Sequence, residues 1–107
     1  MATVDEIFSE METRLKAHPE KIAGINATYQ FDLTGDGGKE KWVKIDGENS
    51  GMGDGQSESP NITITMAESD FQDLVAGKLD GTMAFMSGKL KVKGDMGLAM
   101  KLQNILR

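Results

Sequence analysis

The 107-residue sequence contains no cysteine and only one histidine, His18. Without cysteine, the chain has no disulfide framework, no thiolate nucleophile and no cysteine-based metal site. His18 precedes Pro19 at a predicted helix junction, where a cap or surface role explains it. A catalytic Ser-His-Asp arrangement would depend on this one side chain. The composition therefore argues against an enzyme, a resident metal and a cofactor.

Long apolar runs are also missing. No stretch approaches the ~20 apolar residues that span a bilayer. The acidic start of the sequence lacks the basic head and the apolar run of a secretion signal. A length of 107 residues fits one domain, and we take residues 1–107 as that unit. We expect an intracellular protein, more specifically a cytoplasmic one.

Aromatic residues are few, whereas methionine is abundant: one Trp and one Tyr stand against eight Met. Methionine fills irregular volumes and adapts to ligands of varied shape. The excess fits a cavity for apolar ligands, and it fits equally well a core that methionine simply fills.

Charge is unevenly distributed along a chain whose net charge is −5. Residues 78–107 carry six basic and two acidic side chains, so the acidity lies in the first 77 residues. An acidic chain is a poor nucleic-acid binder. The basic end predicts contact with a lipid headgroup, or transient contact with an anionic membrane, through Lys89, Lys91, Lys93 and Lys101. A solvated strand face that discourages edge pairing is the alternative.

Hydrophobic periodicity divides the first half into a helix and two strands. Residues 3–18 place Val4, Ile7, Phe8, Met11 and Leu15 at helical spacing. Thr3 and Glu6 form a possible capping box, and Pro19 opens a short second helix through Ala23. Residues 25–33 and 41–46 are predicted strands. In the first strand, Gln30 and its alternate neighbours take the face opposite Tyr29 and Phe31.

The second half alternates strands and helices. We predict a weak strand near residues 50–54, a strand opened by Pro60, a helix over 68–76, a short helix over 80–87 and a strand over 89–93. A last helix is predicted over 95–106. Because this helix is apolar on most sides, most of its surface must be covered by the core, a ligand, a partner or a membrane.

Three loops imitate ligand-binding motifs without completing them. Residues 32–43 begin like a calcium loop, but the twelfth position is Val43 instead of a bidentate Glu, and residues 46–57 end at Ser57. The glycines of residues 51–55 lack the spacing of a nucleotide loop, and no helix follows them. We interpret all three as turns.

Four sequence blocks identify a family resemblance: Ile-Thr-Ile-Thr-Met-Ala-Glu-Ser-Asp-Phe (62–71), Gly-Lys-Leu (77–79), Ala-Phe-Met-Ser-Gly-Lys-Leu-Lys (84–91) and Gly-Asp-Met-Gly-Leu-Ala-Met-Lys-Leu-Gln-Asn (94–104). In order and spacing they resemble the sterol carrier protein-2 (SCP-2) domain. The resemblance implies an α+β fold with a five-stranded, mainly antiparallel sheet covered by helices on one face. It also implies an apolar tunnel between the two layers.

The resemblance implies which residues line the tunnel. Carried over by position, they are Trp42, Phe71, Leu74, Val75, Met83, Phe85, Met86, Leu98, Met100, Leu102, Ile105 and Leu106. Trp42 conflicts with strand alternation, which puts it opposite Val43 and Ile45.

The family implies non-catalytic binding and transfer of fatty acids, fatty acyl-CoA, phospholipids or sterols. We expect a monomer that carries such a lipid. The alternative is an accessory or dimerisation module without a bound lipid. Many eukaryotic members end in a peroxisomal Ser-Lys-Leu or Ala-Lys-Leu tail, whereas this sequence ends at Arg107.

Overall fold

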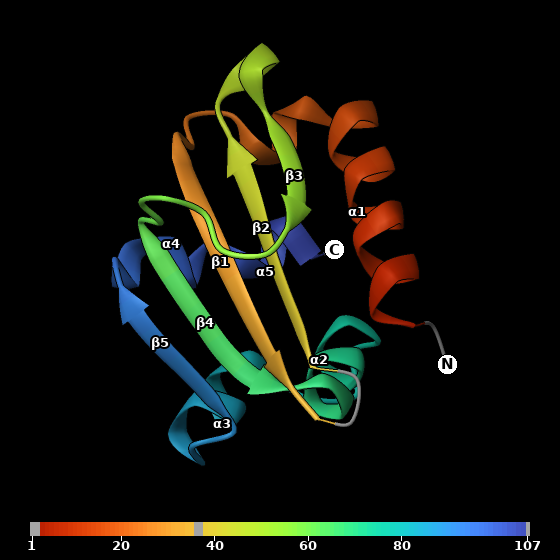
Figure 1. The fold of residues 1–107 in the computed structure, drawn as a ribbon, viewed down its shortest axis with the longest axis vertical. Coiled ribbons are helices and arrows are strands. Elements are labelled where there is room, and N and C mark those ends of the chain that lie inside the picture. The colour runs from red at the N-terminus through yellow and green to blue at the C-terminus, as the bar shows by residue number, and fades with distance from the viewer. Residues whose placement is uncertain (1–2, 36–37, 107) are drawn as a thin grey trace.

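A five-stranded mixed sheet forms one layer of the computed structural model, which describes residues 3–35 and 38–106 (Figure 1). The strands lie in the order β3-β2-β1-β4-β5, and only β1 and β4 run parallel. Their bounds are Ala27–Thr34 (β1), Lys39–Ile45 (β2), Gly51–Asp54 (β3), Ile62–Ala67 (β4) and Leu90–Gly94 (β5). The predicted mainly antiparallel sheet is confirmed.

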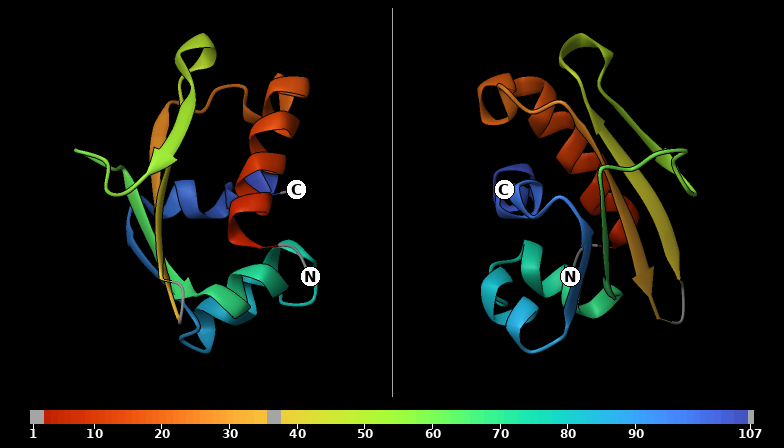
Figure 2. Two further views of the ribbon diagram at one scale, coloured as in Figure 1. Left: turned by 45° about the vertical axis from the view of Figure 1, so that its right-hand side comes forward. Right: turned by 90° about the vertical axis from the view of Figure 1, so that its left-hand side faces the viewer.

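The helices cover one face of this sheet, as the left-hand view of Figure 2 shows. They are α1 (Val4–Ala17), α2 (Glu68–Val75), α3 (Gly81–Met86), α4 (Met96–Met100) and α5 (Leu102–Leu106), with 3₁₀ turns η1 (Pro19–Ile22) and η2 (Gly47–Asn49). Strand alternation is the reason: Tyr29, Phe31 and Leu33 of β1 are buried on the helical face. This face carries the apolar core.

Helix α1 has the ends that the sequence predicts. Thr3 and Glu6 form the capping box: the Glu6 backbone N–H donates to Thr3 Oγ1, and the Thr3 N–H donates to Glu6 Oε1. The helix stops before Pro19, which opens η1. Its buried residues are Val4, Ile7, Phe8, Met11 and Leu15. The predicted apolar stripe is therefore confirmed.

The outer face of the sheet holds an unexpected buried group, Gln30. Residues 55–57 fold across it, and the backbone N–H of Ser57 donates to Gln30 Oε1 at 2.8 Å. Gln30 Nε2 donates to the carbonyl of Gly55 at 3.0 Å. Because both the oxygen and the nitrogen of the Gln30 amide have hydrogen-bond partners, burying this side chain leaves neither atom unsatisfied. Alternation correctly predicts the face, but it does not reveal the loop that covers it.

The single final helix predicted over 95–106 is wrong. The chain forms α4 and α5 with a turn at Lys101, whose N–H donates to the carbonyl of Leu98. One straight helix cannot direct every apolar face to the core. The break buries Leu102, Ile105 and Leu106 and leaves Met96 and Met100 at the surface.

Gly94 allows β5 to pass against the backbone that precedes β4. Its φ is +118°, and a Cβ there would lie 2.4 Å from the carbonyl oxygen of Asn61. This conformation is essentially reserved for glycine. The end of β5, and with it the start of α4, therefore depends on this residue.

We expect Gly94→Ala to lower the free energy of unfolding by about 2–3 kcal/mol, because strain and a backbone clash add. The matched control is Gly88→Ala, where φ is also positive but a Cβ meets nothing within 4 Å. That variant should cost only about 1 kcal/mol. Urea denaturation measures both; equal losses would contradict the close approach at Gly94.

Candidate functional site

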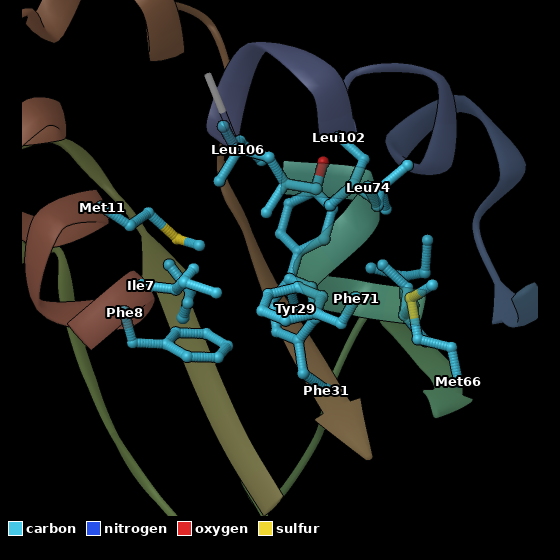
Figure 3. Close-up of a cluster of buried hydrophobic side chains, with 14 of the residues drawn as sticks. Ile7, Phe8, Met11, Tyr29, Phe31, Met66, Phe71, Leu74, Leu102 and Leu106 are labelled. Atoms are coloured by element: carbon cyan, nitrogen blue, oxygen red, sulfur yellow. The ribbon is translucent and has the colours of Figure 1, made fainter. Parts of the chain in front are cut away.

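An aromatic cluster fills the centre of the space between sheet and helices (Figure 3). The ring centroids of Phe8, Phe31 and Phe71 are 5.4, 5.5 and 5.8 Å apart, within the range of favourable aromatic pairs. The cluster joins α1, β1 and α2. Phe71 was predicted to line a tunnel, yet here it is fully buried in this packing.

A first cavity of about 470 Å³ lies over the β2–β3 edge of the sheet, beneath the end of α1 and η1. Its apolar lining is Leu15, Pro19, Ile22, Ala23, Ile25, Val43, Ile45 and Met52, and its charged lining is Glu12, Lys16 and Lys44. The sequence prediction missed this cavity. The signal that could have revealed it is the inward apolar face of β2, which the end of α1 and the short η1 cover.

A second cavity of about 240 Å³ lies over the opposite edge, at β5. It is lined by Leu74, Gly81, Thr82, Phe85, Leu90, Val92, Met96, Ala99, Met100, Leu102 and Leu106. Five of the twelve predicted lipid-binding residues are therefore brought together here: Leu74, Phe85, Met100, Leu102 and Leu106. The charged groups of the first cavity have no counterpart in this lining.

The remaining predicted residues on the helical side divide between core and surface. Val75 and Leu98 are partly buried against the core, and Ile105 is fully buried. Met83 and Met86 are exposed and line neither of the two cavities. The six-residue helix α3 buries only Ala84, and its methionines point away from that contact.

Trp42, predicted to line the tunnel, lies on the other face of the sheet. It pairs with Gln30 and Gly53 on the face away from the helices. A Cβ at Gly53 would lie 2.7 Å from Trp42 Cζ2, so the indole covers this glycine. Neighbouring Val43 faces the core instead and lines the first cavity. Alternation along β2 decides the matter against the position carried over from the resemblance.

Helix α5 lines the second cavity and packs against α1 and η1, which line the first. Arg14 of α1 holds its end, because Nη2 donates to the carbonyl of Leu106 at 2.6 Å and contacts that of Ile105 at 3.5 Å. A cation at the carboxyl end of a helix satisfies its free carbonyls. Leu106 lines the second cavity, so Arg14 positions one of its walls.

The predicted headgroup residues are at the surface. Lys89, Lys91, Lys93 and Lys101 are all exposed. Lys91 and Lys93 lie on β5, paired with Thr65 and Thr63 of β4, while Leu90 and Val92 face inward as predicted. Their solvent access permits contact with an anionic group, and the strand places two of them on one face.

Catalytic and metal signals are weak throughout residues 3–35 and 38–106. His18 is exposed, and its Nδ1 lies 3.1 Å from Glu20 Oε1. Within this part of the chain, no three His, Cys, Asp or Glu side chains gather as metal ligands. The described helices include none with the length and apolarity to cross a membrane.

Comparison with known proteins decides the family. The sequence profile of the SCP-2 sterol transfer family matches residues 8–107. The chain belongs to the SCP-2 family. It is 44% identical over 106 residues to human sterol carrier protein 2, covering 92% of this chain and 19% of that protein. It is 36% identical to non-specific lipid-transfer protein-like 1 of Caenorhabditis elegans, covering 95% of this chain and 88% of that one.

Other SCP-2 relatives are much longer than this chain. It is 38% identical to hydroxysteroid dehydrogenase-like protein 2 of Xenopus laevis but spans only 24% of its length. The fold also matches solved structures. The palmitated SCP2L2 of Aedes aegypti superposes with a TM-score of 0.81 at 22% identity, covering 99% of this chain and 96% of that one. The SCP-2 architecture is thus shared across low sequence identity.

Tyr29 gives the core a measurable pH dependence. Its hydroxyl donates to the carbonyl of Leu98 at 2.7 Å, and burial, with Asp95 nearby, raises its pKa from 10.0 to about 12. The folded state therefore holds this proton more tightly than the unfolded state does. The resulting stability is complete below pH 10 and is lost as pH rises towards 12.

At pH 8 we expect the free energy of unfolding of Tyr29→Phe to be about 1 kcal/mol lower than that of the parent, because the variant lacks the hydrogen bond of the hydroxyl. Between pH 10 and 12 this advantage should fall by roughly 2 kcal/mol, because only the parent must bury or ionise a phenol. Urea denaturation across this range measures the difference. A constant gap between the two proteins would contradict the burial of the hydroxyl.

Trp42, the only tryptophan, provides an optical check of the geometry. Because it lies on the far face of the sheet, lipid that fills either cavity should leave its emission maximum and intensity unchanged. The measurement is a fluorescence titration with a fatty acid, with binding followed in parallel by calorimetry. Strong quenching or a blue shift at saturation would place Trp42 beside the ligand after all.

Proposed function

We propose that this protein is a non-catalytic carrier that binds the apolar chain of a fatty acid or fatty acyl-CoA in the first cavity and transfers it. One observation supports this most directly: an apolar cavity of about 470 Å³ lies between sheet and helices in an SCP-2 family member. Its volume falls in the range of ligand pockets, roughly 300–1,000 Å³. The second cavity, at about 240 Å³, falls below this range.

The lining of the first cavity suits an amphipathic chain. Leu15, Ile25 and Ile45 supply apolar walls, and Lys16 brings a positive charge for an acidic headgroup. Burying a dozen methylenes at ~0.8 kcal/mol each yields roughly 10 kcal/mol before association costs. The binding is mainly hydrophobic, so selectivity among chains should be low.

Phospholipids, which carry two acyl chains, require more space than a cavity sized for a single chain offers. The tunnel implied by the SCP-2 resemblance would form if the two cavities joined. Helix α5 lines the second cavity, contacts η1 of the first and is held by Arg14, so displacement of α5 is the step we propose for larger ligands. The carrier function for single-chain lipids does not depend on this step.

An accessory module is the second candidate. The length of the Xenopus laevis relative, of which this chain spans only 24%, favours it. In that case the cavities would be empty in protein isolated from cells. Native mass spectrometry of such protein distinguishes the two: co-purified lipid supports the carrier and its absence supports the module.

Ile22→Trp tests the first cavity, because a larger side chain there occupies ligand volume. We expect palmitate affinity, measured by calorimetry, to fall at least tenfold. Leu79→Trp is the matched control, because Leu79 is also partly buried against the core but lines neither cavity. The palmitate affinity of this variant should stay within about twofold of that of the parent.

Ala99→Trp separates the two cavities, since Ala99 lines the second. If Ala99→Trp weakens palmitate binding and Ile22→Trp does not, the ligand lies in the second cavity and the proposed placement is wrong. Circular dichroism confirms that each variant folds before its affinity is compared.

A further inference from the structure

Four methionine side chains are exposed on α3 and α4, the two short helices that border the second cavity. Met83 and Met86 of α3 are 64% and 77% exposed, and Met96 and Met100 of α4 are 48% and 85% exposed. Helix α3 precedes β5 and α4 follows it, so the two helices stand at opposite ends of this strand (Figure 1). Met96 and Met100 also line the second cavity. We refer to these four side chains as the outer methionines.

Other methionines are shielded from water by the core. Met11 is fully buried, and Met66 is 3% exposed. Because the chain has no cysteine, its thioethers are its only sulfur groups. An oxidant dissolved in water must reach the sulfur atom in order to react, so burial protects a thioether and exposure makes it reactive. The fold therefore separates an accessible group of methionines from a protected one.

Hydrogen peroxide oxidises an exposed thioether in a single step. The sulfur lone pair attacks one peroxide oxygen, the O–O bond breaks and an S–O bond forms. The sulfur loses two electrons to the second oxygen, which takes up the remaining proton and leaves as water. The product is methionine sulfoxide, a polar side chain that methionine sulfoxide reductases convert back to the thioether.

The lining of the second cavity is poorly suited to a sulfoxide. Among the lining side chains that the structure describes, only Thr82 carries a hydrogen-bond donor. A sulfoxide oxygen that turned inward would lack partners in an apolar site, which is energetically costly. A sulfoxide that turned outward to water would remove its side chain from the cavity wall. In either position, oxidation of Met96 and Met100 reduces the apolar surface that a ligand can contact.

We propose that the outer methionines are a site of reversible oxidation by peroxides, and that the sulfoxides of Met96 and Met100 lower the affinity of the second cavity for apolar ligands. The ligand class is a small, uncharged apolar molecule, because the cavity measures about 240 Å³ and its lining has no charged side chain. An engineered apolar cavity of about 150 Å³ is large enough to bind benzene. This switch concerns the second cavity and does not depend on a lipid in the first.

Peptide mass spectrometry maps the oxidation site after timed exposure of the folded protein to hydrogen peroxide. We expect Met83, Met86 and Met100 to form sulfoxides at least tenfold faster than Met11 and Met66. Oxidation of Met11 or Met66 at the rate of Met100 overturns the proposal, since the fold would then offer no accessible group.

Valine methyl NMR reports on each cavity separately, because the chain has only four valines. Val92 lines the second cavity, Val43 lines the first, and Val4 and Val75 line neither. The probe is benzene, whose ring current shifts the signals of methyl groups beside it. In the parent, the Val92 signals should shift and saturate. If they do not move, the second cavity takes no apolar ligand and the proposal is overturned.

The benzene titration is repeated on protein whose outer methionines are oxidised while Met52, which lines the first cavity, remains reduced. We expect half saturation at Val92 to require at least tenfold more benzene. Treatment with methionine sulfoxide reductase should restore the original affinity. An oxidised protein that binds benzene as tightly as the reduced parent overturns the switch.

Met96→Leu/Met100→Leu is the matched control, because leucine has a similar volume but cannot be oxidised. Its benzene affinity at Val92 should stay within about twofold of that of the reduced parent, with or without peroxide. Met83→Leu/Met86→Leu is altered outside the cavity and should lose affinity on oxidation as the parent does. Equal loss in Met96→Leu/Met100→Leu and in the parent would trace the effect to another group and overturn the proposal.

Palmitate binding separates this switch from the carrier function. No outer methionine lines the first cavity, so palmitate affinity should stay within about twofold after oxidation. If the parent binds no palmitate, the carrier proposal fails, while the benzene titrations still decide the switch. A tenfold loss of palmitate affinity on oxidation, absent in Met96→Leu/Met100→Leu, would support the switch and place palmitate in the second cavity.

Discussion

The contact among Phe8, Phe31 and Phe71 determines where free volume can lie in this fold. These rings join the first helix, the central strand and the second helix within 5.4–5.8 Å. They fill the space over the middle of the sheet, together with Tyr29 and Ile105. Both cavities therefore lie over the sheet edges. A small domain can keep such space only if the remaining core is well packed.

The turn at Lys101 divides the apolar residues of the carboxyl-terminal segment between the core and the surface. It directs α5 into the core, where Arg14 holds its end, and it leaves α4 at the mouth of the second cavity. The helix break therefore separates a segment that packs in the core from one whose methionines are exposed.

Much of the fold could be predicted because its signals are local. The capping box of Thr3 and Glu6, the helix end at Pro19 and the alternation of β1 all depend on neighbouring residues. The blocks that resemble the SCP-2 family supplied the architecture, a five-stranded, mainly antiparallel sheet covered by helices on one face. The site was predicted less well: five proposed lining residues meet at the second cavity, while the larger first cavity was not foreseen.

By itself, the sequence determined the strands, the helices that precede residue 95, the buried face of β1 and the family resemblance, because periodicity, caps and motifs are written in consecutive residues. Only the tertiary structure decided what covers each face. Gln30 is buried because residues 55–57 cross it, and Trp42 lies outside because β2 pairs in this register. Met83 and Met86 are exposed because α3 buries only Ala84. Such contacts join residues distant in sequence, and no local pattern encodes them.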